Sequence, residues 1–92
     1  MKVEFDPVKN DSNIRERGLA FERAVEFDLT TAIVEQDLRK PYPEDRWVAL
    51  GFLDARLHVL CFTPIHGGIR IISFRKANPR EIKCYAQAIA TD

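Results

Sequence analysis

The chain has 92 residues and a mass of 10.6 kDa, which suffices for one domain but not for two stable ones. Its 46% hydrophobic and 30% charged residues are ordinary globular values and exclude a disordered or low-complexity protein. No apolar run approaches the roughly 20 residues of a bilayer span, and no apolar signal segment follows Met1-Lys2. We therefore expect one cytoplasmic domain over residues 1–92, with no membrane partner.

The net charge of zero hides an uneven distribution. Residues 1–54 contain 8 Lys/Arg against 12 Asp/Glu, whereas residues 55–92 contain 6 against 2. Five basic residues and both histidines lie between Ala55 and Arg80, where there is no acidic residue. This segment can create a local positive field that suits a polyanion. The equally weighted alternative is a solvated strand face whose arginines pair with the acidic half.

The first half of the chain predicts a short strand and two helices. Residues 3–5 alternate between apolar and charged, as in a half-buried strand. Asp6-Pro7 provides an N-cap and a first-turn proline, and Gly18 is a stop signal, so a helix is predicted from Pro7 to about Arg17. A second short helix is predicted from about Ala20 to Phe27, with a buried stripe of Phe21, Ala24 and Val25.

The rest of the chain predicts an antiparallel meander and a last helix. A strand is predicted from Leu29 through Val34, followed by a loop over residues 36–45 that contains two prolines. Three more strands are predicted over residues 47–53, 57–62 and 69–74, with connections short enough for hairpins. Asn78-Pro79-Arg80-Glu81 is a capping-box variant that predicts a helix start, and the helix should pack on the sheet through Ile82, Tyr85, Ala86 and Ile89.

These elements indicate an α+β fold: an antiparallel sheet of about four strands with two short N-terminal helices and a C-terminal helix. Cys61 and Cys84 fit neither a disulfide framework nor a zinc motif, so we interpret them as inert thiols in a reducing compartment. We expect no metal and no other cofactor.

Motifs over almost the whole chain resemble those of the BrnT toxins. Phe5-Asp6-Pro7-x-Lys9 opens the chain in family order, and Glu44-Asp45-Arg46-Trp47 and Gly51 follow in the second half. The most specific match is the run Arg70-Ile71-Ile72-Ser73-Phe74-Arg75-Lys76-Ala77. The resemblance implies a RelE-like fold and the toxin of a type II toxin–antitoxin pair, an endoribonuclease that inhibits translation and growth. It also implies a cognate BrnA-like antitoxin that blocks the active face, with operator DNA contacted only indirectly, through that antitoxin.

Metal-independent RNA cleavage uses the substrate's 2′-hydroxyl as nucleophile, so the protein supplies charge stabilisation and proton transfer. The planar fork of arginine matches phosphate oxygens. We assign Arg46, Arg70 and Arg75 as catalytic, because each lies in or beside a predicted strand and matches an arginine of the family pattern. Arg70 and Arg75 are five residues apart, so strict alternation places them on opposite faces. Either a bulge near Ser73-Phe74 or a position of Arg75 beyond the ladder would remove this conflict.

The family's Lys-His-Gly at the end of the first helix is here Glu16-Arg17-Gly18. Arg17 can hold a phosphate but cannot act as a general base. An ordinary histidine side chain titrates near neutral pH, but neither His58 nor His66 matches a family position, so neither is assigned a catalytic role. Contacts to the RNA are expected from Lys9, Arg17, Lys76 and Tyr85. Trp47 and Phe62 are expected to pack in the core, and the Tyr85 ring is expected to be buried with its hydroxyl near the functional edge.

The missing histidine leaves a second function open: a non-catalytic, toxin-like binding module that acts as antitoxin partner and transcriptional co-repressor. A third interpretation is a small globular protein whose basic strand is part of the solvent-exposed surface and has no binding or catalytic role. Arg17 is the residue that separates the first two hypotheses, because it replaces the family's proton-transfer group.

Overall fold

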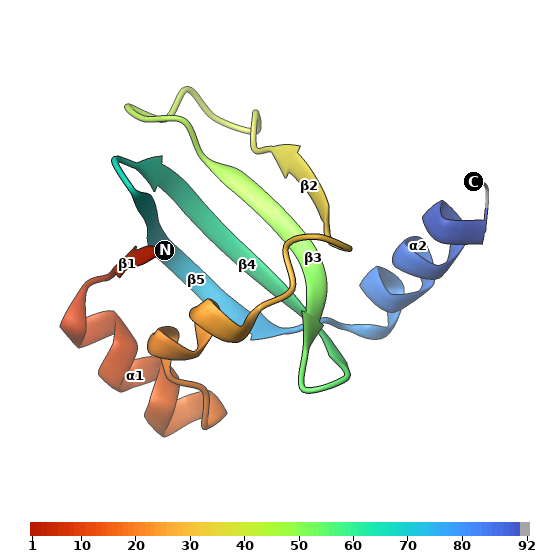
Figure 1. The fold of residues 1–92 in the computed structure, drawn as a ribbon, viewed down its shortest axis with the longest axis horizontal. Helices are drawn as coiled ribbons and strands as arrows, with labels where there is room; N and C mark the ends of the chain where they lie inside the picture. Colours follow the sequence, from red (N-terminus) through yellow and green to blue (C-terminus); the bar gives the residue numbers. More distant parts are fainter. Residues whose placement is uncertain (91–92) are drawn as a thin grey trace.

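The computed structural model describes residues 1–90. In chain order, the elements are β1 (Lys2–Glu4), α1 (Pro7–Arg17), the 3₁₀ helix η1 (Phe21–Glu26), β2 (Ile33–Gln36), β3 (Trp47–Leu53), β4 (Arg56–Ile65), β5 (Gly68–Lys76) and α2 (Pro79–Ala90). Figure 1 shows them along the chain. No helix among the described residues has the length and apolar character needed to cross a bilayer.

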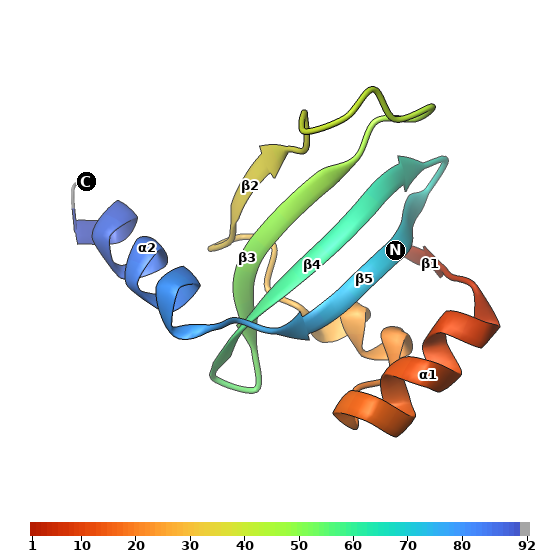
Figure 2. The same cartoon turned by 180° about the vertical axis from the view of Figure 1, so that it is seen from behind.

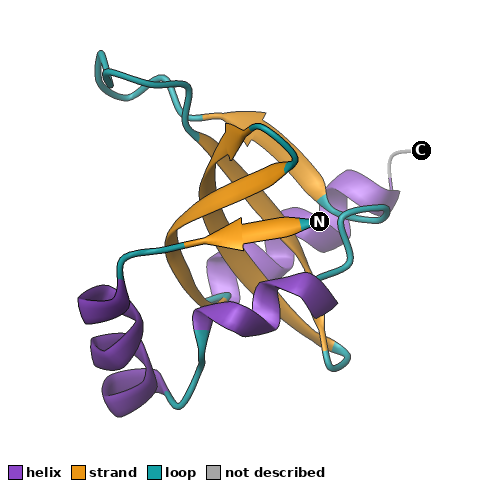
Figure 3. Ribbon diagram, turned by 60° about the vertical axis from the view of Figure 1, so that its left-hand side comes forward, coloured by secondary structure: helices purple, strands orange, loops and turns teal. Residues whose placement is uncertain are grey.

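One sheet of five strands, in the order β1-β5-β4-β3-β2, organises the molecule. Neighbouring strands are antiparallel except β1, which pairs in parallel with β5 through Lys2–Glu4 and Gly68–Arg70. The α+β class and the antiparallel meander of residues 46–76 are therefore confirmed, with β1 as an added parallel edge strand. The arrangement agrees with the RelE-like fold that the resemblance implies. Figure 3 shows α1 and η1 on one side of the curved sheet and α2 on the other.

The main core lies between the sheet and η1. Phe21, Ala24 and Phe27 pack there against buried strand residues, among which Leu53, Leu60 and Phe74 are the largest fully buried side chains. Phe62 is buried in this core and Trp47 packs against it, which confirms their predicted core positions. A smaller cluster on the other sheet face consists of Leu57, Val59, Ala77 and Tyr85.

Two predictions between residues 20 and 34 were wrong in detail. The predicted second helix is a single stretch of 3₁₀ helix, and in this tighter winding Val25 is 60% exposed while Phe27 is buried in its place. The strand begins at Ile33 rather than Leu29, because the Asp28 carboxylate accepts hydrogen bonds from Thr30 and Thr31 and holds them in a turn.

The helix α1 matches its predicted limits and docks through amides rather than apolar side chains. Asp6 caps its N-terminus, and Gly18, with a φ of 65°, ends it. Val8 is exposed, while Asn10 and Asn13 are the buried residues of the helix. Asn10 accepts a hydrogen bond from the backbone N–H of Phe21 at 2.8 Å.

The Asn13 amide makes the longest-range of these contacts. Its Nδ2 donates to the carbonyl oxygens of Leu19 and Phe74, both at 2.9 Å, and its Oδ1 accepts from Arg17 at 2.8 Å. One side chain thereby joins α1, the turn after it and the edge of β5.

The helix α2 begins at Pro79 as predicted, with reciprocal hydrogen bonds between Asn78 and Glu81. The prediction that its apolar stripe packs on the sheet was wrong for all but Tyr85, since Ile82 and Ile89 are 41% and 51% exposed. Figures 1 and 2 show that α2 projects past β2. A cavity of about 240 Å³ separates part of the helix from the sheet, lined by Ile33, Glu35, Val48, Leu50, Cys84 and Ala88.

The two cysteines differ in their surroundings. Cys61 is buried, and this burial raises the pKa of its thiol, as expected for an inert group. Cys84 lies exposed on the projecting α2, so burial does not protect its thiol as it protects that of Cys61.

We predict that Asn13→Ala lowers the free energy of unfolding by about 1–3 kcal/mol, because two backbone carbonyls lose their shared donor. Urea unfolding followed by circular dichroism measures the change. Asp11→Asn, an exposed substitution on the same helix, is the matched control and should stay within about 0.5 kcal/mol of the parent. Equal stability of Asn13→Ala and the parent would contradict the docking role of this amide.

Candidate active site

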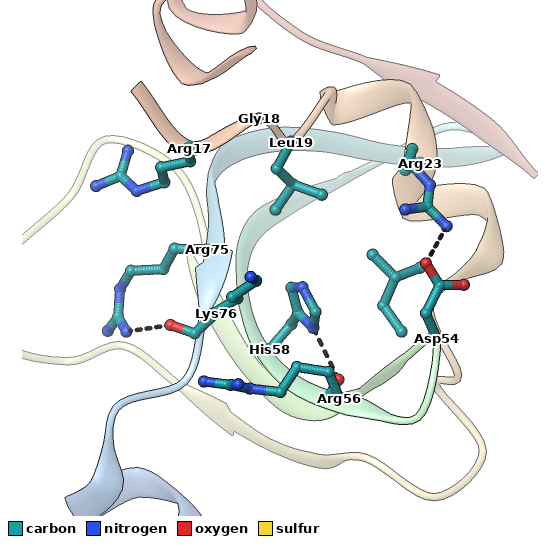
Figure 4. Close-up of a pocket in the computed structure, with 10 residues that line it drawn as sticks. Arg17, Gly18, Leu19, Arg23, Asp54, Arg56, His58, Arg75 and Lys76 are labelled. Carbon is teal, nitrogen blue, oxygen red and sulfur yellow. Dashed lines mark hydrogen bonds and ion pairs between the residues drawn. The ribbon is translucent and has the colours of Figure 1, made fainter. Parts of the chain in front are cut away.

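A cavity of about 690 Å³ opens at the end of the sheet where β3 turns into β4. We call it the cation cavity, because five of its ten lining residues are basic. The lining consists of Arg17, Gly18, Leu19, Arg23, Leu53, Asp54, Arg56, His58, Arg75 and Lys76. Figure 4 shows that these side chains come from α1, η1, the β3–β4 hairpin and the end of β5, and that the guanidinium groups of Arg17 and Arg75 are directed away from His58.

Two tight backbone features bring these residues together. The N–H of Gly18 donates to the carbonyl of Ile14, which closes α1 and leaves Arg17 at its last turn. Asp54 and Ala55 have φ values of 52° and 60°, as both central residues of a type I′ hairpin require. This two-residue turn places Asp54 beside the cavity and starts β4 at Arg56.

Positive charge in the cation cavity exceeds the negative charge available to neutralise it. Arg23 pairs with Asp54 at 2.6 Å and with Glu26 at 3.2 Å, and these hydrogen bonds raise the pKa of its guanidinium. Within residues 1–90, Arg17, Arg56 and Lys76 form no ion pair with a carboxylate. Three uncompensated cations around one concave space create a positive field that favours an anion.

Arg75 occupies the rim of the cavity, where its guanidinium is held by the α2 capping carboxylate. Its two terminal nitrogens donate to the Glu81 oxygens at 2.8 and 2.9 Å, which raises the pKa of Arg75 and lowers the pKa of Glu81. The bidentate pair fixes the direction of the Arg75 guanidinium. A bound anion would have to compete with Glu81 for this group.

His58 is the buried titratable group of the cavity. The residue is 4% exposed, its Nδ1 lies 2.7 Å from the Arg56 carbonyl oxygen, and its ring centroid lies 5.7 Å from that of Phe74. The sequence analysis assigned His58 no role, because it matches no family position. The feature that places His58 in the cavity is the register of β4 with β5, in which His58 pairs directly with Lys76. This register cannot be predicted from the sequence of one strand alone.

A bulge resolves the spacing of Arg70 and Arg75. Cys61 pairs with Ser73 whereas Phe62 pairs with Ile71, so Ile72 is an extra residue in β5. Arg75 remains within the ladder, opposite Val59. Of the two alternatives, the bulge is the one present, one residue before the predicted place.

The structure does not bring the three predicted catalytic arginines together. Arg70 lies at the opposite end of β5, where it pairs with Glu4 of β1 at 3.3 Å. Arg46 precedes β3, with its guanidinium carbon 3.9 Å from the Tyr42 ring centroid and its buried Nε without a hydrogen-bond partner in the described part of the chain. Of the three, only Arg75 lines the cation cavity.

The predicted RNA contacts also divide. Arg17 and Lys76 line the cation cavity, and Lys9 lies along α1 beside a smaller hollow of about 230 Å³ that Arg17 shares. Tyr85 is 6% exposed, and its hydroxyl donates to the Thr31 carbonyl at 2.8 Å. Its ring was correctly expected to be buried, but its hydroxyl is directed to a backbone carbonyl of the loop before β2. We therefore leave Tyr85 out of the proposed RNA surface.

A small α+β domain with unpaired arginine and lysine side chains around a cavity has the features of a protein that acts on a phosphodiester. The chain belongs to the BrnT family: residues 5–81 match the family model described as "Ribonuclease toxin, BrnT, of type II toxin-antitoxin system". No curated protein and no solved structure matches the chain. The match includes every residue that lines the cation cavity. No group of three or more His, Cys, Asp or Glu side chains in residues 1–90 is placed to hold a metal ion.

We predict that Glu81→Gln increases affinity for RNA about two- to fivefold, because Arg75 then loses its competing carboxylate. Glutamine can still accept the capping hydrogen bond, so α2 should keep its start. Fluorescence anisotropy with a short RNA fully 2′-O-methylated against cleavage measures the change. Asp11→Asn, which removes an equal charge on the outer side of α1, should leave the affinity nearly unchanged. An unchanged affinity in Glu81→Gln would exclude Arg75 as a phosphate contact.

Proposed function

We propose that this toxin is a metal-independent endoribonuclease that acts in the cytoplasm, cuts RNA through the substrate's own 2′-hydroxyl and thereby inhibits translation and growth. The observation that supports this proposal is the cation cavity, where Arg17, Arg56 and Lys76 have no carboxylate partner among the described residues. Fixed cations around a concave space stabilise the extra negative charge of a pentacoordinate phosphorus better than water does.

In this proposal, the scissile phosphate lies in the cation cavity and the flanking RNA follows the sheet. Arg75 contacts the reacting phosphate from the cavity rim. Arg70 and Arg46, at the opposite end of the strands, bind phosphates of neighbouring nucleotides. Lys9 extends the basic track along α1. The roles of the three arginines thus separate into one at the reaction centre and two for binding.

We propose a BrnA-like antitoxin as the neutralising partner. The exposed Ile82 and Ile89 on α2 support a protein partner at this end of the molecule, because a partner could cover them together with the adjacent Arg75–Glu81 pair. Operator DNA would be reached only through the antitoxin.

We predict that the purified chain cleaves RNA in the presence of EDTA and arrests growth when expressed alone. Arg75→Ala should lower kcat about 100- to 1000-fold, the usual loss for one transition-state donor. Arg70→Ala should mainly raise KM, because its phosphate contact is equally present before and during the reaction. Both substitutions should relieve growth arrest, and circular dichroism should show that both variants remain folded.

Full activity in both variants would contradict the assignment of these arginines. If the unmodified chain cleaves no RNA but still binds its antitoxin and represses their operon, the non-catalytic binding module becomes the function.

A further inference from the structure

We propose that His58 is the general base of the cleavage reaction, accepting the proton of the substrate's 2′-hydroxyl at Nε2. This inference rests on the proposed ribonuclease function and assigns the proton-transfer step that the arginines cannot perform. His58 lies near the start of β4, the central strand of the sheet. The family's histidine motif instead falls at the end of α1, where this chain has Arg17.

The hydrogen bond at Nδ1 determines which nitrogen is available. A backbone carbonyl oxygen only accepts, so the 2.7 Å contact with Arg56 requires the proton on Nδ1. The neutral ring then carries its lone pair on Nε2, which has no hydrogen-bond partner among the described residues. Figure 4 shows this second nitrogen on the side of the ring away from the Arg56 carbonyl. The backbone thus selects the tautomer that a general base needs.

Packing fixes the ring in place. His58 lies in the central strand β4, between Gly51 of β3 and Lys76 of β5, and contacts the fully buried Phe74. A base on such a rigid element can be positioned with little conformational freedom. His58 is 4% exposed and lines the cation cavity, so a small part of the residue is open to it.

The surroundings of His58 favour its neutral form. Burial lowers the pKa of the imidazole, and repulsion from Arg56, Lys76 and Arg23 lowers it further, against the opposing effect of the Arg56 carbonyl. Arg17, Arg75 and the Arg23-bound carboxylate of Asp54 are the other charged groups that line the same cavity. At pH 7 the ring is therefore ready to accept a proton, whereas the guanidinium and ammonium groups around it are not.

The other lining residues offer no alternative base. The Asp54 carboxylate forms an ion pair with the Arg23 guanidinium, with an O–N distance of 2.6 Å. His66 lies exposed in the β4–β5 turn, at the far end of the strand from His58. Within the lining of the cation cavity, His58 is thus the group that combines a free lone pair with a fixed position.

The reaction step balances as follows. Nε2 takes the proton of the 2′-hydroxyl while the 2′-oxygen forms a bond to the adjacent phosphorus. The bond between phosphorus and the 5′-oxygen breaks, its electron pair stays on that oxygen, and water at the cavity mouth supplies the proton. The products are a 2′,3′-cyclic phosphate and a 5′-hydroxyl, and the imidazolium returns its proton to solvent. Arg17, Arg56 and Lys76 stabilise the intervening negative charge.

The first test compares His58→Gln with His66→Gln. The former should slow RNA cleavage about 100- to 10,000-fold, the usual range for a lost general base, and should bind the 2′-O-methylated RNA with an unchanged Kd. The parent rate should rise with pH through the depressed pKa of His58 and then level off, and His58→Gln should lose this dependence. His66→Gln should retain both the rate and the profile, with circular dichroism recorded at each pH.

A second measurement needs no variant at this buried site. Nitrogen-15 NMR of the parent protein follows the titration of both imidazoles with and without inorganic phosphate. A bound anion favours the imidazolium, so phosphate should raise the pKa of His58 and leave His66 unchanged. The assignment would be overturned if phosphate left the pKa of His58 unchanged. It would also be overturned if His58→Gln cleaved RNA at the parent rate and with the parent pH profile. Absence of cleavage by the parent chain would instead overturn the ribonuclease function, and the general-base role with it.

Discussion

The positioning of the candidate site depends on the hydrogen bonds of one buried amide, that of Asn13. The helix α1 has no apolar face against the sheet, so hydrophobic burial cannot determine how it sits. The amide instead donates to Leu19 and Phe74 and accepts from Arg17, and such contacts are directional. An apolar contact would let the helix slide, whereas a buried hydrogen bond is lost on a small displacement. Arg17 is thereby held at a fixed place relative to β5 and His58.

The edge of β5 makes this attachment possible. The strand β1 covers only Gly68–Arg70, and Gly68 permits its approach, since a Cβ there would lie 1.8 Å from the Lys2 carbonyl oxygen. Beyond this short pairing, the outer carbonyl of Phe74 is free to accept from Asn13. The bulge at Ile72 lies between the two parts of the strand and keeps both Ile71 and Phe74 in the main core. One strand therefore supplies a covered end, with Arg70, and an open end, with Arg75.

The sequence predicts local features well and long-range ones poorly. Capping residues and hairpin turns have local causes, which is why the limits of α1, the start of α2 and the antiparallel strands β3 to β5 were correct. The orientation of α2 depends on what its stripe meets in space, and no pattern in residues 79–90 encodes that. The candidate site was predicted only in part for the same reason. Arg17, Arg75 and Lys76 were identified from motifs, whereas His58 joins them through the pairing of β4 with β5.

The charge pattern of the chain also depends on this geometry. From the sequence, pairing of the basic segment with the acidic half and a positive site were alternatives, and the structure contains both. Arg70 of the basic segment pairs with Glu4 of the acidic half, so part of the positive charge is neutralised. Within residues 1–90, the carboxylates that balance the net charge form no ion pair with Arg56 or Lys76. Because low-dielectric walls concentrate the field of such residues within a cavity, a chain of zero net charge can still attract a phosphodiester to one place.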